Sequence, residues 1–169
     1  MLLLGIYIYC VSIATTKAMS IVSHREDVVG SEWPIDPICG FVAATNIETI
    51  YPSWSCNVSG VPNSDACNWH GVSCSVEGEL VSILVQDNKL VGTLTPSLGS
   101  IASIDEISIL LTNITGSLPS SWGFMIGMQK LDLSSNSLTG SLPSSWGSMT
   151  GMQQLHLHSN SLAGSLPSS

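Results

Sequence analysis

Hydrophobic residues recur with a period of 24 residues over the second half of the chain, and this repetition restricts the possible folds more than any other feature of the sequence. Each period opens with two apolar residues separated by one other residue. A unit of this size cannot bury its own apolar face, so the units must stack into a solenoid with one continuous core. The opening pairs are Ile83 and Val85, Ile107 and Ile109, Leu131 and Leu133, and Leu155 and Leu157.

The spacing is that of leucine-rich repeats, whose pattern is L-x-L-x-x-N-x-L-x-G-x-L-P. The alternating opening predicts a short strand with its apolar side chains on one face. The glycine column and the Leu-Pro pairs at 118–119 and 142–143 predict turns and extended segments on the other side. We therefore predict a leucine-rich-repeat solenoid with a parallel β-sheet on its concave side, an irregular or 3₁₀ convex side, and a small disulfide-bonded helical N-terminal cap.

An asparagine stands five residues after the first apolar residue of three strands, at Asn88, Asn136 and Asn160. In stacked coils its side-chain amide can bond backbone groups of neighbouring turns, which would otherwise be buried unpaired at a cost of about 1–3 kcal/mol each. The second repeat has Thr112 at this position and Asn113 one place later. We expect weaker hydrogen bonding between the coils at this position, since a hydroxyl offers only one donor.

The chain divides into a signal peptide, a loose leader, a cap that covers the open end of the first coil, and the repeats. Because the fourth repeat stops in mid-pattern, we expect a fragment of a longer protein, with membrane attachment only through a missing C-terminal segment. The predicted segments are 1–18, 19–37, 38–79 and 80–169, and the last comprises repeats 80–103, 104–127, 128–151 and the incomplete 152–169.

The signal peptide is predicted from residues 2–14, which carry no charge, and from Thr16-Lys17-Ala18, which places small residues around a cleavage site. The alternatives are an uncleaved anchor and a buried helix. A run this short falls below the roughly 20 apolar residues that a membrane span needs. Removal of the segment and export of the chain are therefore the favoured interpretation.

Four cysteines remain after the one in the signal peptide is set aside, and four cysteines allow three disulfide pairings. We favour Cys67–Cys74, because the two lie close together in a Cys-x-Trp-x-Gly-Val-x-Cys segment, and Cys39–Cys56 by remainder. A metal site at Cys67, His70 and Cys74 is the alternative. Secretion and the interleaved tryptophan and glycine favour disulfides.

The charge composition argues against a nucleic-acid partner. The chain has a formal net charge of −8 and only four lysines and arginines, which are scattered. A nucleic-acid-binding surface requires clustered basic side chains. We therefore predict no nucleic-acid binding.

The segment Cys67-Asn-Trp69-His-Gly71-Val72-Ser-Cys74, which runs into the first repeat, resembles the N-terminal domain of plant-type leucine-rich-repeat proteins. Leu138-Thr-Gly140-Ser-Leu142-Pro143 is similar to the repeats of the same subclass. That group includes receptor-like kinases, receptor-like proteins and polygalacturonase inhibitors. The resemblance implies an extracellular recognition protein.

A second resemblance concerns the large residues in the repeats. Leu118-Pro-Ser-Ser-Trp122-Gly-Phe-Met125 and Leu142-Pro-Ser-Ser-Trp146-Gly-Ser-Met149 place tryptophan and methionine where plant repeats usually have leucine or isoleucine. This is similar to the surface-antigen repeat proteins of kinetoplastid parasites. That resemblance implies adhesion at a cell surface.

The outward positions of the predicted concave strands are the candidate binding residues. This surface is mixed, small and nearly neutral, which suits a protein or glycan ligand. Leu84, Leu110 and Leu111 form either a small apolar contact patch or merely scattered surface leucines. The candidates are Leu84, Gln86, Ser108, Leu110, Lys130, Asp132, Ser134, His156 and His158.

His156 and His158 are two residues apart on a predicted strand, and Asp132 is expected one rung away, at about 4.8 Å. The three could chelate a metal or form an Asp–His couple. No further ligand is evident to complete a metal site, and no nucleophile is placed for catalysis. We therefore predict a solvated strand face, with no catalytic residue, no metal and no cofactor.

Asn57-Val-Ser59 and Asn113-Ile-Thr115 are N-glycosylation sequons in a secreted chain. The sequence as a whole predicts a non-catalytic scaffold, secreted or at the cell surface, that recognises or adheres to a protein or glycan through its concave sheet. The alternatives are a secreted inhibitor of the polygalacturonase-inhibitor type and an ectodomain fragment of a receptor-like kinase.

Overall fold

The computed structural model describes residues 36–164. The expected signal peptide and the leader up to residue 35 lie outside these residues. Within 36–164, no helix is long and apolar enough to cross a membrane.

The cap opens with two short helices, α1 (Pro37–Ala44) and α2 (Ile47–Ile50). Asp36 caps the first helix, since its carboxylate accepts a hydrogen bond from the backbone N–H of Ile38 at 3.0 Å, and a proline occupies the first turn. Tyr51 ends α2 in an extended conformation, as expected for a residue that precedes proline. The predicted helical cap is therefore present.

Two disulfides hold the cap, and they join Cys39 to Cys56 and Cys67 to Cys74, the pairing favoured from the sequence. The 3₁₀ turn η1 (Ala66–Asn68) carries Cys67. The indole rings of Trp54 and Trp69 are buried within the cap, with centroids 5.2 Å apart. The two aromatic rings and two cross-links stabilise this small unit, and its buried residues are continuous with the core of the repeats.

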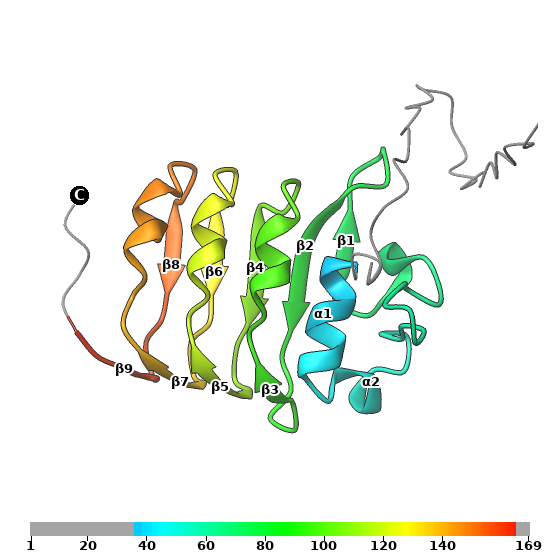
Figure 1. Ribbon diagram of the computed structural model, residues 1–169, viewed down its shortest axis with the longest axis horizontal. Helices are drawn as coiled ribbons and strands as arrows, with labels where there is room; N and C mark the ends of the chain where they lie inside the picture. The colour runs from blue at the N-terminus through cyan, green and yellow to red at the C-terminus, as the bar shows by residue number, and fades with distance from the viewer. Residues whose placement is uncertain (1–35, 165–169) are drawn as a thin grey trace, which may run out of the picture. The chain divides into compact units, whose positions relative to one another are not determined.

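The concave sheet has the strand order β1-β2-β4-β6-β8 (Figure 1). The first strand pairs antiparallel with the second, and the others are parallel. Ile83, Ile107, Leu131 and Leu155 lie opposite one another in register, as the 24-residue period requires. The strands are β1 (Val72–Cys74), β2 (Leu80–Val85), β4 (Glu106–Ile109), β6 (Lys130–Asp132) and β8 (Gln154–His156).

The opposite side contains 3₁₀ turns, as expected. A second parallel sheet, which the sequence analysis did not include, runs along the lower edge of the solenoid in Figure 1. The turns are η2 (Pro96–Ser100), η3 (Ser120–Phe124) and η4 (Ser144–Ser148), and α1 packs against the first of them. The second sheet consists of β3 (Val91–Thr93), β5 (Asn113–Ser117), β7 (Ser137–Gly140) and β9 (Ser161–Leu162).

The core between the two sides is filled by the repeating columns. Trp122 and Trp146 are buried and stack in parallel, with ring centroids 6.3 Å apart and planes at 4°. Each indole N–H donates to a backbone carbonyl of the preceding coil, at Thr95 and Pro119, and both distances are 2.9 Å. Burying an indole without such a partner would cost free energy, so these bonds fix the spacing of the coils.

The asparagine ladder is complete in the third and fourth coils. The amide of Asn136 donates to the carbonyl of Ile109 at 2.7 Å, and its oxygen accepts the backbone N–H of Ile114 at 3.2 Å. Asn160 makes the corresponding bonds one coil later. Asn88, in contrast, is exposed and takes part through its backbone carbonyl, which accepts from the Asn113 amide. The ladder therefore begins later than the spacing predicted.

Candidate ligand-binding surface

We define the concave surface as the outward positions of β2, β4, β6 and β8 together with the first two residues that follow each of these strands. Side chains alternate along a strand, so these positions face away from the core. Parallel pairing places Leu84 opposite Ser108 and Asp132 opposite His156. The nine residues predicted from the sequence all lie on this surface, in three columns that cross the strands.

The accessibility of these positions differs widely. Leu84 is 43% exposed and Gln86 is also exposed, whereas Ser108 and Ser134 are each only 4% exposed. The two serines lie on the same face as larger side chains, and the hydroxyl of Ser134 donates to Asp132 at 2.6 Å. On the concave surface, Ser108 and Ser134 are therefore small side chains with little solvent exposure, whereas residues such as Leu84 and Gln86 project into solvent.

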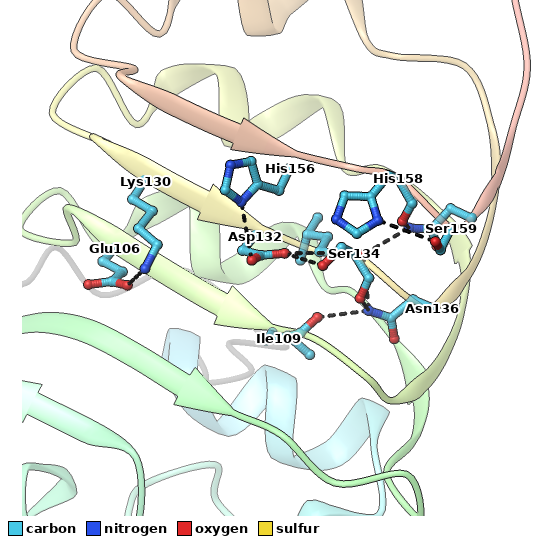
Figure 2. Close-up of polar contacts among 11 residues, drawn as sticks. Glu106, Ile109, Lys130, Asp132, Ser134, Asn136, His156, His158 and Ser159 are labelled. Carbon is cyan, nitrogen blue, oxygen red and sulfur yellow. Dashed lines mark hydrogen bonds and ion pairs between the residues drawn. The ribbon is translucent and has the colours of Figure 1, made fainter.

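Glu106 and Lys130 form an ion pair across β4 and β6, with Nζ 2.7 Å from Oε1 (Figure 2). The hydrogen bond that Lys130 donates to Glu106, together with the negative charge of Glu106, raises the pKa of Lys130 above its ordinary value. A shallow depression of about 230 Å³ lies beside the pair. It is lined by the polar side chains of Asp105, Glu106, Gln129, Lys130, Gln153 and Gln154.

Asp132 is the centre of a second polar cluster (Figure 2). One carboxylate oxygen accepts from the backbone N–H and the hydroxyl of Ser134, at 2.9 and 2.6 Å, and the other lies 3.3 Å from Nδ1 of His156. Burial alone would raise the pKa of Asp132, but the Ser134 hydrogen bonds and His156 lower it by more, so the carboxylate stays ionised below its usual range.

His156 and His158 are both exposed, with ring centroids 6.5 Å apart, and Nδ1 of His158 lies 3.2 Å from the hydroxyl of Ser159 (Figure 2). In residues 36–164, no group of three metal-ligating side chains is placed to hold an ion. The cluster can offer hydrogen bonds from the imidazole rings of His156 and His158.

Leu84, Leu110 and Leu111 lie at the N-terminal half of the concave surface. Leu110 is half-buried and Leu111 is 48% exposed. Leu111 has a φ angle of +54°, in the left-handed region, where an L-residue other than glycine, asparagine or aspartate is disfavoured by about 1–2 kcal/mol. The sequence placed Leu111 in an apolar patch but gave no sign of this backbone strain.

The sequence analysis did not include a second exposed apolar pair, Phe124 and Ile126, which are 78% and 65% exposed at the end of η3. The aligned positions of the next coil are Ser148 and Thr150. Comparing the repeats column by column would have found this pair.

Both predicted glycosylation residues are exposed. Asn57 lies in a cap turn, where its side-chain oxygen accepts the backbone N–H of Ser59 at 2.9 Å. Asn113 begins β5, and its amide donates to the carbonyl of Asn88. The side chain of the second predicted glycosylation residue, Asn113, therefore takes part in the stacking of the coils.

Comparison with known proteins agrees with this geometry. Residues 127–149 match the Leucine Rich Repeat family. A stretch of 62 residues is 33% identical to a relative from Arabidopsis thaliana named "Probable inactive leucine-rich repeat receptor-like protein kinase", and the match covers 37% of this chain and 8% of the relative.

Solved structures with this fold include plant receptor ectodomains. The ectodomain of BIR2 from Arabidopsis thaliana superposes with a TM-score of 0.67 at 26% identity, over 79% of this chain and 72% of that one. The Arabidopsis receptor kinase HAESA, in complex with the peptide hormone IDA and the co-receptor SERK1, gives a TM-score of 0.66 at 28% identity, over 78% of this chain and 22% of HAESA.

The fold is therefore a leucine-rich-repeat solenoid with a small disulfide-bonded N-terminal cap. Its similarity is to the ectodomains of plant receptor-like kinases. The chain spans less than a tenth of the length of the receptor-like protein kinase that it matches.

Proposed function

We propose that this chain is the N-terminal part of an extracellular, non-catalytic scaffold that binds a protein ligand on its concave surface. The observation that carries the proposal is the concave sheet, on which apolar and ionisable side chains from successive coils converge. Solvent-exposed polar and apolar groups on a rigid parallel sheet can be varied independently of the core. The two disulfides support an oxidising, extracellular location.

The comparisons support a protein as the ligand. HAESA was solved with a peptide hormone and a co-receptor, and its ectodomain shares this fold. Nearly neutral charge on the concave surface, where Glu106 offsets Lys130 and Asp132 lies beside His156, suits a protein surface. A glycan is the second chemical class, and the polar depression beside Lys130 would be its site.

The binding experiment uses the chain secreted from plant cells, probed with arrays of synthetic secreted plant peptides, plant receptor ectodomains and cell-wall oligosaccharides. We expect the chain in the medium, saturable binding to a peptide or ectodomain probe, and loss of that binding in Q86R and H158R. These two side chains are exposed, so their replacement leaves the core intact. The matched control is S148R, on the exposed end of η4.

Retention of the chain in the cytosol would contradict the extracellular assignment. Equal loss of binding in S148R and in the concave variants would contradict the concave site. Binding to oligosaccharides alone would replace the protein ligand with a glycan.

Adhesion is the second candidate, favoured by the tryptophan and methionine columns at Trp122, Met125, Trp146 and Met149 that resemble kinetoplastid surface antigens. The reading frame beyond Ser169 separates these possibilities. A kinase domain there would support a receptor, and a hydrophobic tail preceded by small residues would support a lipid-anchored adhesin. Inhibition of a polygalacturonase by the purified chain would instead support an inhibitor.

A further inference from the structure

The two disulfides of the cap differ in how far a solute can reach them. Both cysteines of the Cys67–Cys74 bridge are partly exposed, and both line an open cleft of about 720 Å³. The cleft lies where the start of α1, η1, the turn between β1 and β2, and the end of η2 meet. In the other bridge Cys39 is only 2% exposed, and neither Cys39 nor Cys56 lines the cleft. A dissolved thiol therefore has open access to the first bridge and restricted access to the second.

The two bridges also close loops of different length. Cys67 and Cys74 are 7 residues apart in the sequence, whereas Cys39 and Cys56 are 17 apart. In the chain-entropy model a shorter loop stabilises the folded state less, so the fold loses less stability when Cys67–Cys74 opens. Two thiols so close along the chain also stay near each other after reduction, which favours closure of the bridge on re-oxidation.

Hydrogen bonds hold the segment between these two cysteines independently of the bridge. The backbone N–H of Cys67 donates to the carboxylate of Asp65 at 3.0 Å. Trp69 is buried, and its indole N–H donates to the hydroxyl of Ser64 at 2.9 Å. Reduction of the bridge should therefore loosen this half of the cap without unfolding it.

β1 connects the bridge to the concave sheet. Cys74 is the last residue of β1, which is the edge strand of that sheet beside β2 (Figure 1). The pairing of β1 with β2 is irregular between Ser73 and Cys74. Because a bulge disrupts the ladder of hydrogen bonds, the covalent link contributes to the order of this strand end. Opening the bridge should affect the end of β1 first.

Acidic side chains restrict the reductant that can enter the cleft. Asp36, Asp65 and Glu79 line it, and no lysine or arginine of the described chain does so. The carboxylates of Asp36 and Asp65 each accept a backbone N–H, which offsets part of their charge, whereas Glu79 is exposed. Like charges repel, so a reductant with further negative groups is slowed. The cleft suits a dithiol that carries no other charge.

We propose that Cys67–Cys74 is a redox-sensitive bridge, which a dithiol opens reversibly while Cys39–Cys56 and the repeats stay intact. A thiolate of the reductant attacks one sulfur of the bridge, forms a mixed disulfide and releases the other sulfur, which takes up a proton. The second thiol of the reductant then attacks the mixed disulfide and releases the first cysteine. The reductant becomes a disulfide, and two electrons and two protons pass to Cys67 and Cys74. This inference goes beyond binding on the concave surface, and its test needs no ligand.

The test treats the folded, secreted chain with dithiothreitol, an otherwise uncharged dithiol, and blocks free thiols with iodoacetamide at successive times. Mass spectrometry of the peptides gives the labelled fraction at each cysteine. We expect Cys67 and Cys74 to be labelled together, at least about tenfold faster than Cys39 and Cys56, because access controls the rate of exchange. In urea the two bridges should react at similar rates, since access is then equal. Removal of dithiothreitol should restore the bridge.

Variants and hydrogen exchange separate local opening from general unfolding. We expect C67S/C74S to fold, with faster amide exchange in β1 and η1 and unchanged exchange in β6. The matched pair C39S/C56S removes the bridge with the longer loop, and its melting temperature should fall further than that of C67S/C74S.

Four outcomes would overturn the inference. These are labelling of all four cysteines at one rate, faster labelling of Cys39 and Cys56, faster exchange in β6 once Cys67–Cys74 is reduced, and a C67S/C74S chain that does not fold. The last two would give the bridge a purely structural role. None of the four bears on binding at the concave surface, so the proposed function would stand.

Discussion

Repeats two (104–127) and three (128–151) bury the same columns and differ on their surfaces. Ile107 and Leu131 lie in register, Trp122 stacks on Trp146, and both indoles donate to the coil before them. The aligned surface residues, however, are Leu110, Leu111, Phe124 and Ile126 in repeat two and Ser134, Ser135, Ser148 and Thr150 in repeat three.

This difference distinguishes the buried residues, which stabilise the solenoid, from the exposed residues, which are available to a partner. The buried columns are determined by stacking, which is the same problem in every coil. Stacking does not determine the exposed columns. The side chains of Leu111 and Phe124 contribute little to the stability of the fold, because each is about half exposed or more. Repeat two therefore carries an apolar surface on a scaffold that repeat three shows to be stable without it.

The largest effect should come from breaking the shared tryptophan column. W122A removes a side chain with no exposed surface that lies between two coils, and we expect a loss of about 3–5 kcal/mol in the free energy of unfolding, measured with urea. W146A should cost less, because Trp146 is 7% exposed. F124S should change the free energy by no more than about 0.5 kcal/mol. A smaller loss for W122A than for W146A would show that the two repeats are not packed alike.

The next effect concerns the asparagine ladder, where repeat two has Thr112 and repeat three has Asn136. N136A leaves the Ile109 carbonyl and the Ile114 N–H without their partners, and we expect a loss of about 2–3 kcal/mol. T112A removes only a hydroxyl that donates to Asn136, so the loss should be about 1 kcal/mol. Urea denaturation of both variants measures the difference. Equal losses would contradict the weaker rung predicted for repeat two.

A pH-dependent effect should be confined to repeat three, since Asp132 aligns with Ser108. The pKa of Asp132 is lower in the folded chain than its ordinary value of 3.8, so the unfolded chain binds more protons in this range. The stabilisation is therefore fully present above the unfolded pKa and is lost as the pH falls through the folded pKa. The difference in unfolding free energy between the wild type and D132N should shrink on acidification below about pH 4. A difference that stays constant from neutral to strongly acidic pH would contradict this account.

The smallest effect should come from the ion pair that joins the two repeats. Glu106 and Lys130 are partly exposed, so water and salt weaken their interaction. A double-mutant cycle with E106Q and K130M should give a favourable coupling that is smaller than either core effect and that falls when salt is added. A coupling that does not change with salt would point to packing of the side chains.

The sequence was sufficient to predict the fold because buried columns repeat. The period gave the register of Ile83, Ile107 and Leu131, and the cysteine spacing favoured the observed pairing. The second sheet was not predicted, because its strands are short and pair through backbone groups around glycines such as Gly116, so they show no hydrophobic alternation.

The sequence predicted which residues lie on the candidate surface, but not their solvent exposure, hydrogen bonds or backbone conformation. Alternation along a strand places Ser108 and Asp132 on one face. The coverage of Ser108, the capping of Asp132 by Ser134 and the left-handed backbone of Leu111 depend on neighbouring coils and on the turn. These features arise only when the coils are assembled.

The angles of the two tryptophan pairs also give the two regions of the molecule different optical signals. Coupling between two indoles produces circular dichroism only when their electronic transitions are not parallel. The stack of Trp122 and Trp146, with planes 4° apart, should therefore contribute little, whereas the cap pair, Trp54 and Trp69, tilted by 43°, should contribute more. The coupled signal should disappear in W54F or W69F and remain in W122F or W146F, and following it during unfolding would record when the cap opens, without any added label.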